Sequence, residues 1–136
     1  MRPWKPLLLL TALALLTLAG CSGNVRVTGQ VVENGQSFAL PKGEALEVHF
    51  ITMDPEVVPG RDYMKMVSDN GSFVADQADN SGRGLPPGKY KVTLHSETPV
   101  VGQKLRGKPE LSTDLQVARG SPVHLTIDLG ARTITH

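Results

Sequence analysis

The sequence predicts an all-β fold, an antiparallel β-sandwich of about seven strands, from the pattern of residues 25–129. Apolar and polar residues alternate in several short segments, as they do in half-buried strands. Turn-forming residues separate these segments at regular intervals. No convincing helical pattern follows the first 20 residues. Because a single sheet of this kind would leave its apolar face in water, we expect two packed sheets.

The first two predicted strands alternate clearly. In residues 25–32, the face predicted to be buried consists of Val25, Val27, Gly29 and Val31. An Asn-Gly pair then marks a tight hairpin turn within residues 33–36. In residues 45–53, the face predicted to be buried consists of Leu46, Val48 and Phe50.

The middle of the chain predicts two shorter strands. Proline and glycine interrupt residues 54–62, which are expected to form a loop. Residues 63–67 follow as a strand, and the sequence does not decide which of its two faces points into the core. The two alternatives are Tyr63 with Val67, or Met64 with Met66. Residues 68–75 predict a tight turn and a short strand.

The last three predicted strands occupy residues 90–95, 113–118 and 122–129. Tyr90 starts the first of them on its inward face. Residues 96–112 between the first two are expected to form a long loop. The dipeptide Gly-Ser and the preceding arginine separate the final pair of strands.

The N-terminus has the order of a secretory signal peptide. Arg2 and Lys5 form a positive region, and residues 7–18 form an almost unbroken apolar run. This run is too short for a membrane-spanning helix, which needs roughly 20 residues. We therefore predict that residues 1–20 are a removable signal.

The end of this segment, Leu18-Ala19-Gly20-Cys21, resembles the lipobox of bacterial lipoproteins, and Cys21 is the only cysteine. The resemblance implies that Leu18, Ala19 and Gly20 direct a signal peptidase to cut before Cys21. It also implies that the Cys21 thiol accepts a diacylglyceryl group and that acyl chains such as palmitate hold the chain to a membrane. The alternative is an ordinary signal peptide followed by a chance cysteine.

The predicted location is the bacterial cell envelope, with residues 21–24 as a short lipidated tether. The resemblance to bacterial lipoproteins also implies that Ser22, in place of aspartate, favours the periplasmic face of an outer membrane where the cell has one. Two of the 14 Lys and Arg residues lie in the signal, which leaves 12 against 13 Asp and Glu. A chain with this balance lacks the dominant basic surface of a nucleic-acid-binding protein.

Four segments, VTGQVVENGQ, VHF, SDNGSF and GLPPGKYKVTL, occur in an order that resembles the carboxypeptidase regulatory-like domains. The resemblance implies an Ig-like, prealbumin-like (transthyretin-like) β-sandwich over residues 25–130, followed by a C-terminal tail, 131–136. Gly71 permits a turn, and Leu85 closes one end of the sandwich. Tyr90 is expected to bond back to the corner formed by the prolines before it, like a tyrosine corner. The peptidase domain that names the family is absent, so no peptidase activity is implied.

Three histidines, His49, His95 and His124, are predicted to point outward into water. If two of them shared one sheet, they would be neighbours and a weak zinc site would be conceivable. Aspartates and an asparagine near 69–80 fail the spacing of a calcium loop, because Ala78 stands at a ligand position. No motif for a nucleophile or a glutamate pair is present, and we expect neither enzyme activity nor a cofactor.

The sequence therefore favours a membrane-anchored, non-catalytic module with a structural or protein-interaction role. The alternative is a carbohydrate-binding module, which needs exposed aromatic faces, and Phe38 and Tyr63 are the two candidates. The partner, an envelope protein or a glycan, is not specified. A possible binding loop carries the basic residues Lys104, Arg106 and Lys108, which suit anionic lipid or an acidic partner.

Overall fold

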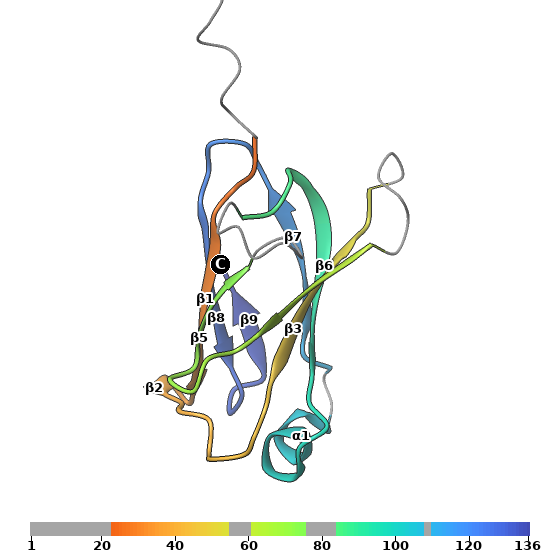
Figure 1. The fold of residues 1–136 in the computed structure, drawn as a ribbon. Coiled ribbons are helices and arrows are strands. Elements are labelled where there is room, and N and C mark those ends of the chain that lie inside the picture. Colours follow the sequence, from red (N-terminus) through yellow and green to blue (C-terminus); the bar gives the residue numbers. More distant parts are fainter. Residues whose placement is uncertain (1–22, 55–60, 76–83, 108–109) are drawn as a thin grey trace, which may run out of the picture.

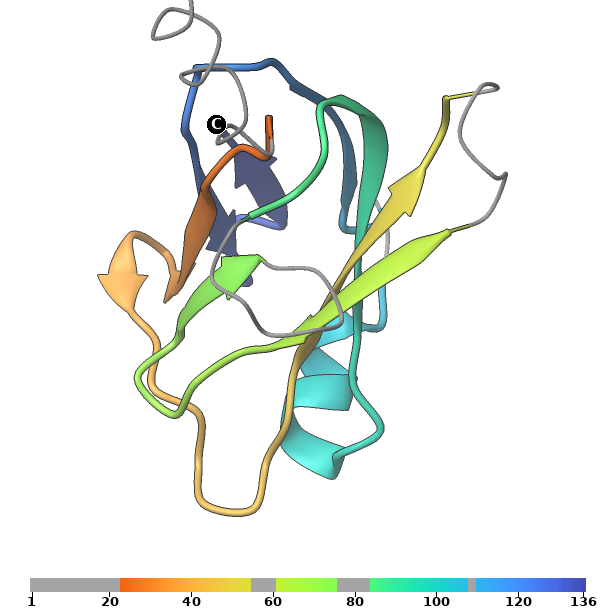
Figure 2. The same cartoon turned by 45° about the horizontal axis from the view of Figure 1, so that its top comes forward.

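The protein is an all-β sandwich of two sheets with one short helix (Figure 1). The computed structural model describes residues 23–54, 61–75, 84–107 and 110–136. The first sheet, here called the β1 sheet, has the order β2-β1-β8-β9, with β5 also paired to β1. The second, the β3 sheet, has the order β4-β3-β6-β7. Figure 2 shows the two sheets from another side, with the helix at one end.

The strands are bounded as follows: β1 Val27–Glu33, β2 Gln36–Ser37, β3 Glu47–Thr52, β4 Asp62–Met66, β5 Ser72–Ala75, β6 Gly88–His95, β7 Ser112–Val117, β8 Val123–Asp128 and β9 Thr133–Thr135. All seven segments predicted as strands contain one of them. The described residues hold nine strands, so the predicted count of seven is corrected. The additional strands are short: β2 follows the Asn34-Gly35 turn, where both residues have positive φ, and β9 lies in the segment expected as a tail.

The sandwich is mixed rather than purely antiparallel, because β1 and β8 pair in parallel. Val27 lies opposite Val123, and Val32 lies opposite Asp128. The connection between β7 and β8 crosses from the β3 sheet to the β1 sheet at the end where β1 begins (Figure 1). Because β8 therefore starts at the same end as β1, the two strands run in the same direction.

The segment predicted as a long loop contains the helix α1, Pro99–Leu105. Proline is compatible with the first turn, where its missing N–H costs nothing. The Glu44 carboxylate accepts a hydrogen bond from the Val101 backbone N–H at 2.8 Å, and the Val101 side chain is fully buried in the core. Tertiary contacts therefore form a helix that seven residues would not sustain alone.

The core fills the space between the inner faces of the two sheets. Every predicted inward residue of β1 and β3 is buried. The open question about residues 63–67 is resolved by burial, since Tyr63 and Val67 lie in the core while Met64 and Met66 are exposed. Phe73 packs across Gly29, where a Cβ atom would come within 2.0 Å of the phenyl ring.

The corner before β6 has the features expected from the sequence. Leu85 is fully buried and exchanges two backbone hydrogen bonds with Val25, at 2.8 and 2.9 Å. Gly84, with φ of +84°, lets the two backbones approach, because a Cβ there would lie 1.9 Å from the Val25 carbonyl oxygen. The Tyr90 hydroxyl donates to the Pro86 carbonyl at 2.6 Å, which confirms the predicted bond to the corner. Burial raises the pKa of this hydroxyl, so it stays a donor.

Candidate functional site

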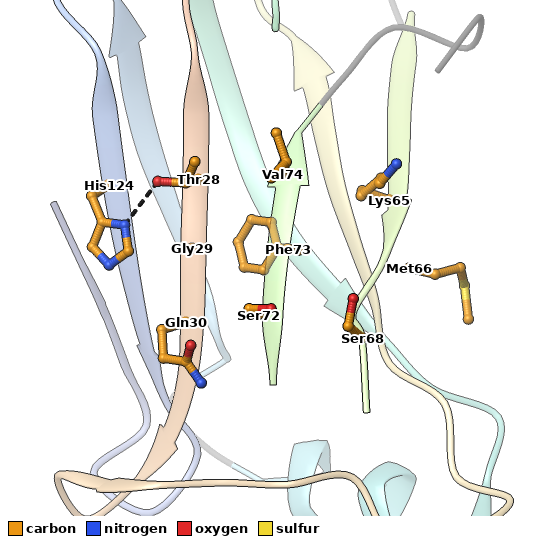
Figure 3. Close-up of a pocket in the computed structure, with 10 residues that line it drawn as sticks. All are labelled: Thr28, Gly29, Gln30, Lys65, Met66, Ser68, Ser72, Phe73, Val74 and His124. Atoms are coloured by element: carbon orange, nitrogen blue, oxygen red, sulfur yellow. Dashed lines mark hydrogen bonds between the residues drawn. The ribbon is translucent and has the colours of Figure 1, made fainter. Parts of the chain in front are cut away.

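A shallow depression of about 430 Å³ lies beside β5, where the edge of the β1 sheet meets the edge strand β4 (Figure 3). Its walls are formed by Thr28, Gly29, Gln30, Lys65, Met66, Ser68, Ser72, Phe73, Val74 and His124. Most of these residues are polar. The depression is open and lacks the enclosed apolar walls typical of small-molecule sites.

Several polar groups that line the depression have hydrogen-bond partners within the protein. Thr28 Oγ1 and His124 Nδ1 lie 2.8 Å apart, as the dashed line in Figure 3 marks. The Ser72 hydroxyl donates to the Asn70 side chain at 2.6 Å. A threonine beside a histidine resembles a nucleophile and its base, but within the described residues no carboxylate orients the ring of His124.

A second cluster lies on the outer face of the β3 sheet. The His49 ring is flanked by two carboxylates, with Asp62 Oδ2 2.7 Å from Nδ1 and Glu47 Oε2 3.1 Å from Nε2. The ring of His95 packs edge-on against His49, with centroids 6.3 Å apart. Burial lowers the pKa of His49, but the hydrogen bonds that its ring donates to the Asp62 and Glu47 carboxylates, and their negative charges, outweigh burial, so the pKa is raised overall.

The three histidines were all predicted to point outward into water, and they differ in how exposed they are. His95 and His124 are exposed as predicted. His49 points outward but is only 20% exposed, because its neighbours cover it. His49 and His95 share one sheet, and His124 lies on the other. In the part of the chain that the structure describes, no group of three or more His, Cys, Asp or Glu side chains is already arranged around a metal position.

The basic residues of the predicted binding loop are partly used inside the protein. Lys104 pairs with Glu33 at 2.5 Å and lies over the Phe38 ring. Arg106 is exposed just after α1, and Lys108 lies outside the described residues. Sequence reasoning missed Arg132, whose guanidinium donates to three carbonyls in and after α1. Arg132 belongs to no sequence motif that could have revealed this role.

The aromatic pair considered for carbohydrate binding does not form a surface platform. Tyr63 is only 6% exposed and packs edge-on against Tyr90. Phe38 is partly buried against the core, beneath the Lys104 side chain. The two rings are therefore not exposed together.

The residues of the predicted lipidation site, Leu18, Ala19, Gly20 and Cys21, lie outside the described residues. The described chain begins at Gly23, and Val25 is already buried and hydrogen-bonded to Leu85. None of the helices in the described ranges is long and apolar enough to cross a membrane. Neither a family model nor a curated protein matches the sequence.

Proposed function

We propose that this protein is a cell-envelope lipoprotein whose β-sandwich is a non-catalytic structural or protein-interaction module. The observation that carries the proposal is the run Leu18-Ala19-Gly20-Cys21 directly after a short apolar segment. Acyl chains on Cys21 would supply the anchor, since each buried CH₂ contributes about 0.8 kcal/mol and two or more chains hold stably. The resemblance to carboxypeptidase regulatory-like domains belongs to the same proposal.

The start of the folded region supports a sandwich held close to its membrane. Val25 takes part in the backbone pairing with Leu85, four positions after Cys21. Four extended residues span at most about 14 Å. The end of the sandwich that carries Val25, Leu85 and the β7–β8 connection would therefore face the lipid.

The same geometry directs the other end of the sandwich away from the anchor. Helix α1 lies at the end opposite the point where the chain enters β1 (Figure 1). Arg132, Glu44 and the Lys104–Glu33 pair tie this end together. A braced surface that projects from the membrane suits contact with an envelope protein better than contact with the anchoring lipid.

Metabolic labelling with an alkyne-bearing palmitate, followed by mass spectrometry of the N-terminus, tests the anchor. We expect the wild-type chain to lose 20 residues, to carry label on Cys21 and to float with membranes. Cys21→Ser should lose both label and flotation, and Ser22→Ala is the matched control that should keep them. Unlabelled wild type, or unchanged flotation of Cys21→Ser, would contradict the proposal.

The interaction role is tested by crosslinking the wild-type lipoprotein in cells. A photo-crosslinking residue at position 100, in α1, should capture a specific envelope protein, and one at position 119, beside the anchored end, should capture lipid. Recovery of polysaccharide or peptidoglycan fragments without protein would favour a carbohydrate-binding role instead.

A further inference from the structure

The end of the sandwich where β1 begins, here called the anchored end, carries three exposed cations. Arg26 lies just before β1, Lys89 lies at the start of β6, and Arg119 lies in the turn between β7 and β8. Figure 1 shows these three segments at one end of the molecule, opposite α1. The exposed Met53 is at the same end, since its backbone N–H donates to the Lys89 carbonyl at 2.8 Å. Cations beside an exposed apolar side chain suit contact with a membrane surface.

These cations are not neutralised inside the protein. In the described part of the chain, none of the three forms an ion pair with a carboxylate. At the α1 end, by contrast, Lys104 pairs with Glu33, and Arg132 donates to backbone carbonyls. The cations of the anchored end therefore keep their charge and their N–H donors for a ligand outside the protein.

Arg119 lies beside the start of the described chain. A Cβ atom added at Gly23 would lie 2.9 Å from Arg119 Nη2, so the guanidinium rests against the Gly23 backbone. Gly23 follows Cys21 by two positions, and two extended residues span at most about 7 Å. A lipid on Cys21 would therefore hold this guanidinium close to the headgroups of the membrane.

An open hollow beside these residues gives a headgroup access to them. The hollow has a volume of about 260 Å³ and lies between residues 24–26 and residues 120–122. Arg26 forms part of one wall, and the exposed Ser121 forms part of the other. Next to Arg119, Gly120 has nothing within 4 Å of an added Cβ, so the turn leaves this rim uncovered. Because a guanidinium donates two parallel hydrogen bonds to a phosphate, the hollow suits a phosphate-bearing headgroup.

We propose that the anchored end binds the headgroups of anionic phospholipids through Arg26 and Arg119, with Lys89 beside them. The inference rests on the lipid anchor proposed above, because the anchor is what holds this end at the membrane. It differs from the binding loop expected around Lys104, which lies at the α1 end and would face away from the lipid.

The distribution of charge along the sandwich supports this orientation. Four of the described carboxylates, those of Glu33, Glu44, Glu97 and Asp128, lie toward the α1 end. Asp54 is at the anchored end, but it lies beside Gly88 in the β3 sheet. Since the chain after the signal is nearly neutral, the attraction to anionic lipid is local to the anchored end.

The test separates headgroup binding from lipidation. The chain 21–136 with Cys21→Ser contains every described residue and carries no acyl chain. Its cosedimentation with vesicles of phosphatidylglycerol or of phosphatidylcholine measures binding to an anionic and to a neutral surface. We expect binding to the anionic vesicles alone, with lower affinity at higher salt. Arg26→Gln and Arg119→Gln should each weaken it about fivefold, which is the contribution of one cation at an anionic lipid surface.

Arg106→Gln is the matched control, because Arg106 is an exposed arginine just after α1, at the opposite end. This change should leave vesicle binding as it is, and circular dichroism checks that each variant is folded. Equal binding to both kinds of vesicle, or equal losses in Arg106→Gln and Arg119→Gln, would overturn the headgroup surface. Palmitate labelling of Cys21 tests the anchor separately: a labelled chain that fails the vesicle test keeps the anchor and loses this surface alone.

Discussion

The two sheets share one core but present different outer faces. The outer face of the β1 sheet carries hydroxyls, at Thr28, Ser72 and Thr126, with His124 bonded to one of them. The outer face of the β3 sheet carries carboxylates, imidazoles and thioethers. The inner faces alone form the packed core, so the side chains on the outer faces can vary without loss of packing. The difference shows that the two faces of one core carry different sets of polar side chains without disturbing the packing between the sheets.

The largest expected effect comes from the core that both faces share. Leu125 on β8 is fully buried, and Leu125→Ala should lower the free energy of unfolding by about 2–5 kcal/mol. Thr126→Ala, one position on and facing outward, is the matched change and should cost less than about 0.5 kcal/mol. Urea unfolding monitored by circular dichroism measures both. Similar losses for the two would show that the outer face is not independent of the core.

The next effect concerns the corner that joins the sheets at the end where β1 begins. Gly84→Ala should destabilise by about 2–3 kcal/mol or more, since it combines a strained positive φ with a clash against the Val25 carbonyl. Gly35→Ala is the control, because Gly35 has a similar φ of +80° but nothing within 4 Å of an added Cβ. The difference between their unfolding free energies isolates the clash. Equal values would mean that the corner relaxes to admit a side chain.

A smaller effect is expected at the tyrosine of the same corner. Tyr90→Phe removes the hydrogen bond to Pro86 and leaves the ring in the core. The loss should be about 0.5–1.5 kcal/mol. Urea denaturation at neutral pH measures it, with an unchanged slope as the sign that the fold is retained. No loss would mean that water replaces the hydroxyl at no cost.

The smallest effect is a pH dependence that distinguishes the two faces. The pKa of His49 is raised in the folded state, so the stability it contributes is complete below its unfolded pKa, about 6.5, and is lost as pH rises through the folded value. The charged or titratable groups facing it are Glu47, Asp62, His95 and Lys91.

His49→Gln should therefore flatten the fall in stability above that pH, measured as unfolding midpoints at several pH values without metal. His124→Gln is the control, because its ring pairs with the neutral Thr28 hydroxyl. An identical pH profile in wild type and His49→Gln would remove the electrostatic difference between the faces.

Alternation along the chain was sufficient to predict most strands and their buried faces. It failed to decide residues 63–67, where both faces offer apolar side chains; the aromatic contact of Tyr63 with Tyr90 settles that strand. It also missed α1, because Val100, Val101 and Gly102 are poor helix formers in isolation. Their helix depends on Glu44, a residue more than 50 positions away.

The candidate sites were harder to predict than the fold, because they depend on pairing between strands. The outward position of His49 followed from alternation. Asp62 and His95 reach it only through the register of β3 with β4 and β6, which a single sequence does not specify. The same holds for the Thr28–His124 contact on the other sheet.

The parallel pairing of β1 with β8 governs when the protein is able to fold. Thr28 and His124 are separated by 96 positions, which at roughly 5–20 residues per second is about 5–20 seconds of synthesis. Until β8 is made, β1 has no neighbour on that side, and pairing over such a separation is slow. The β1 sheet therefore closes only after β8 has been made, and until then the side of β1 that faces β8 has no strand to pair with.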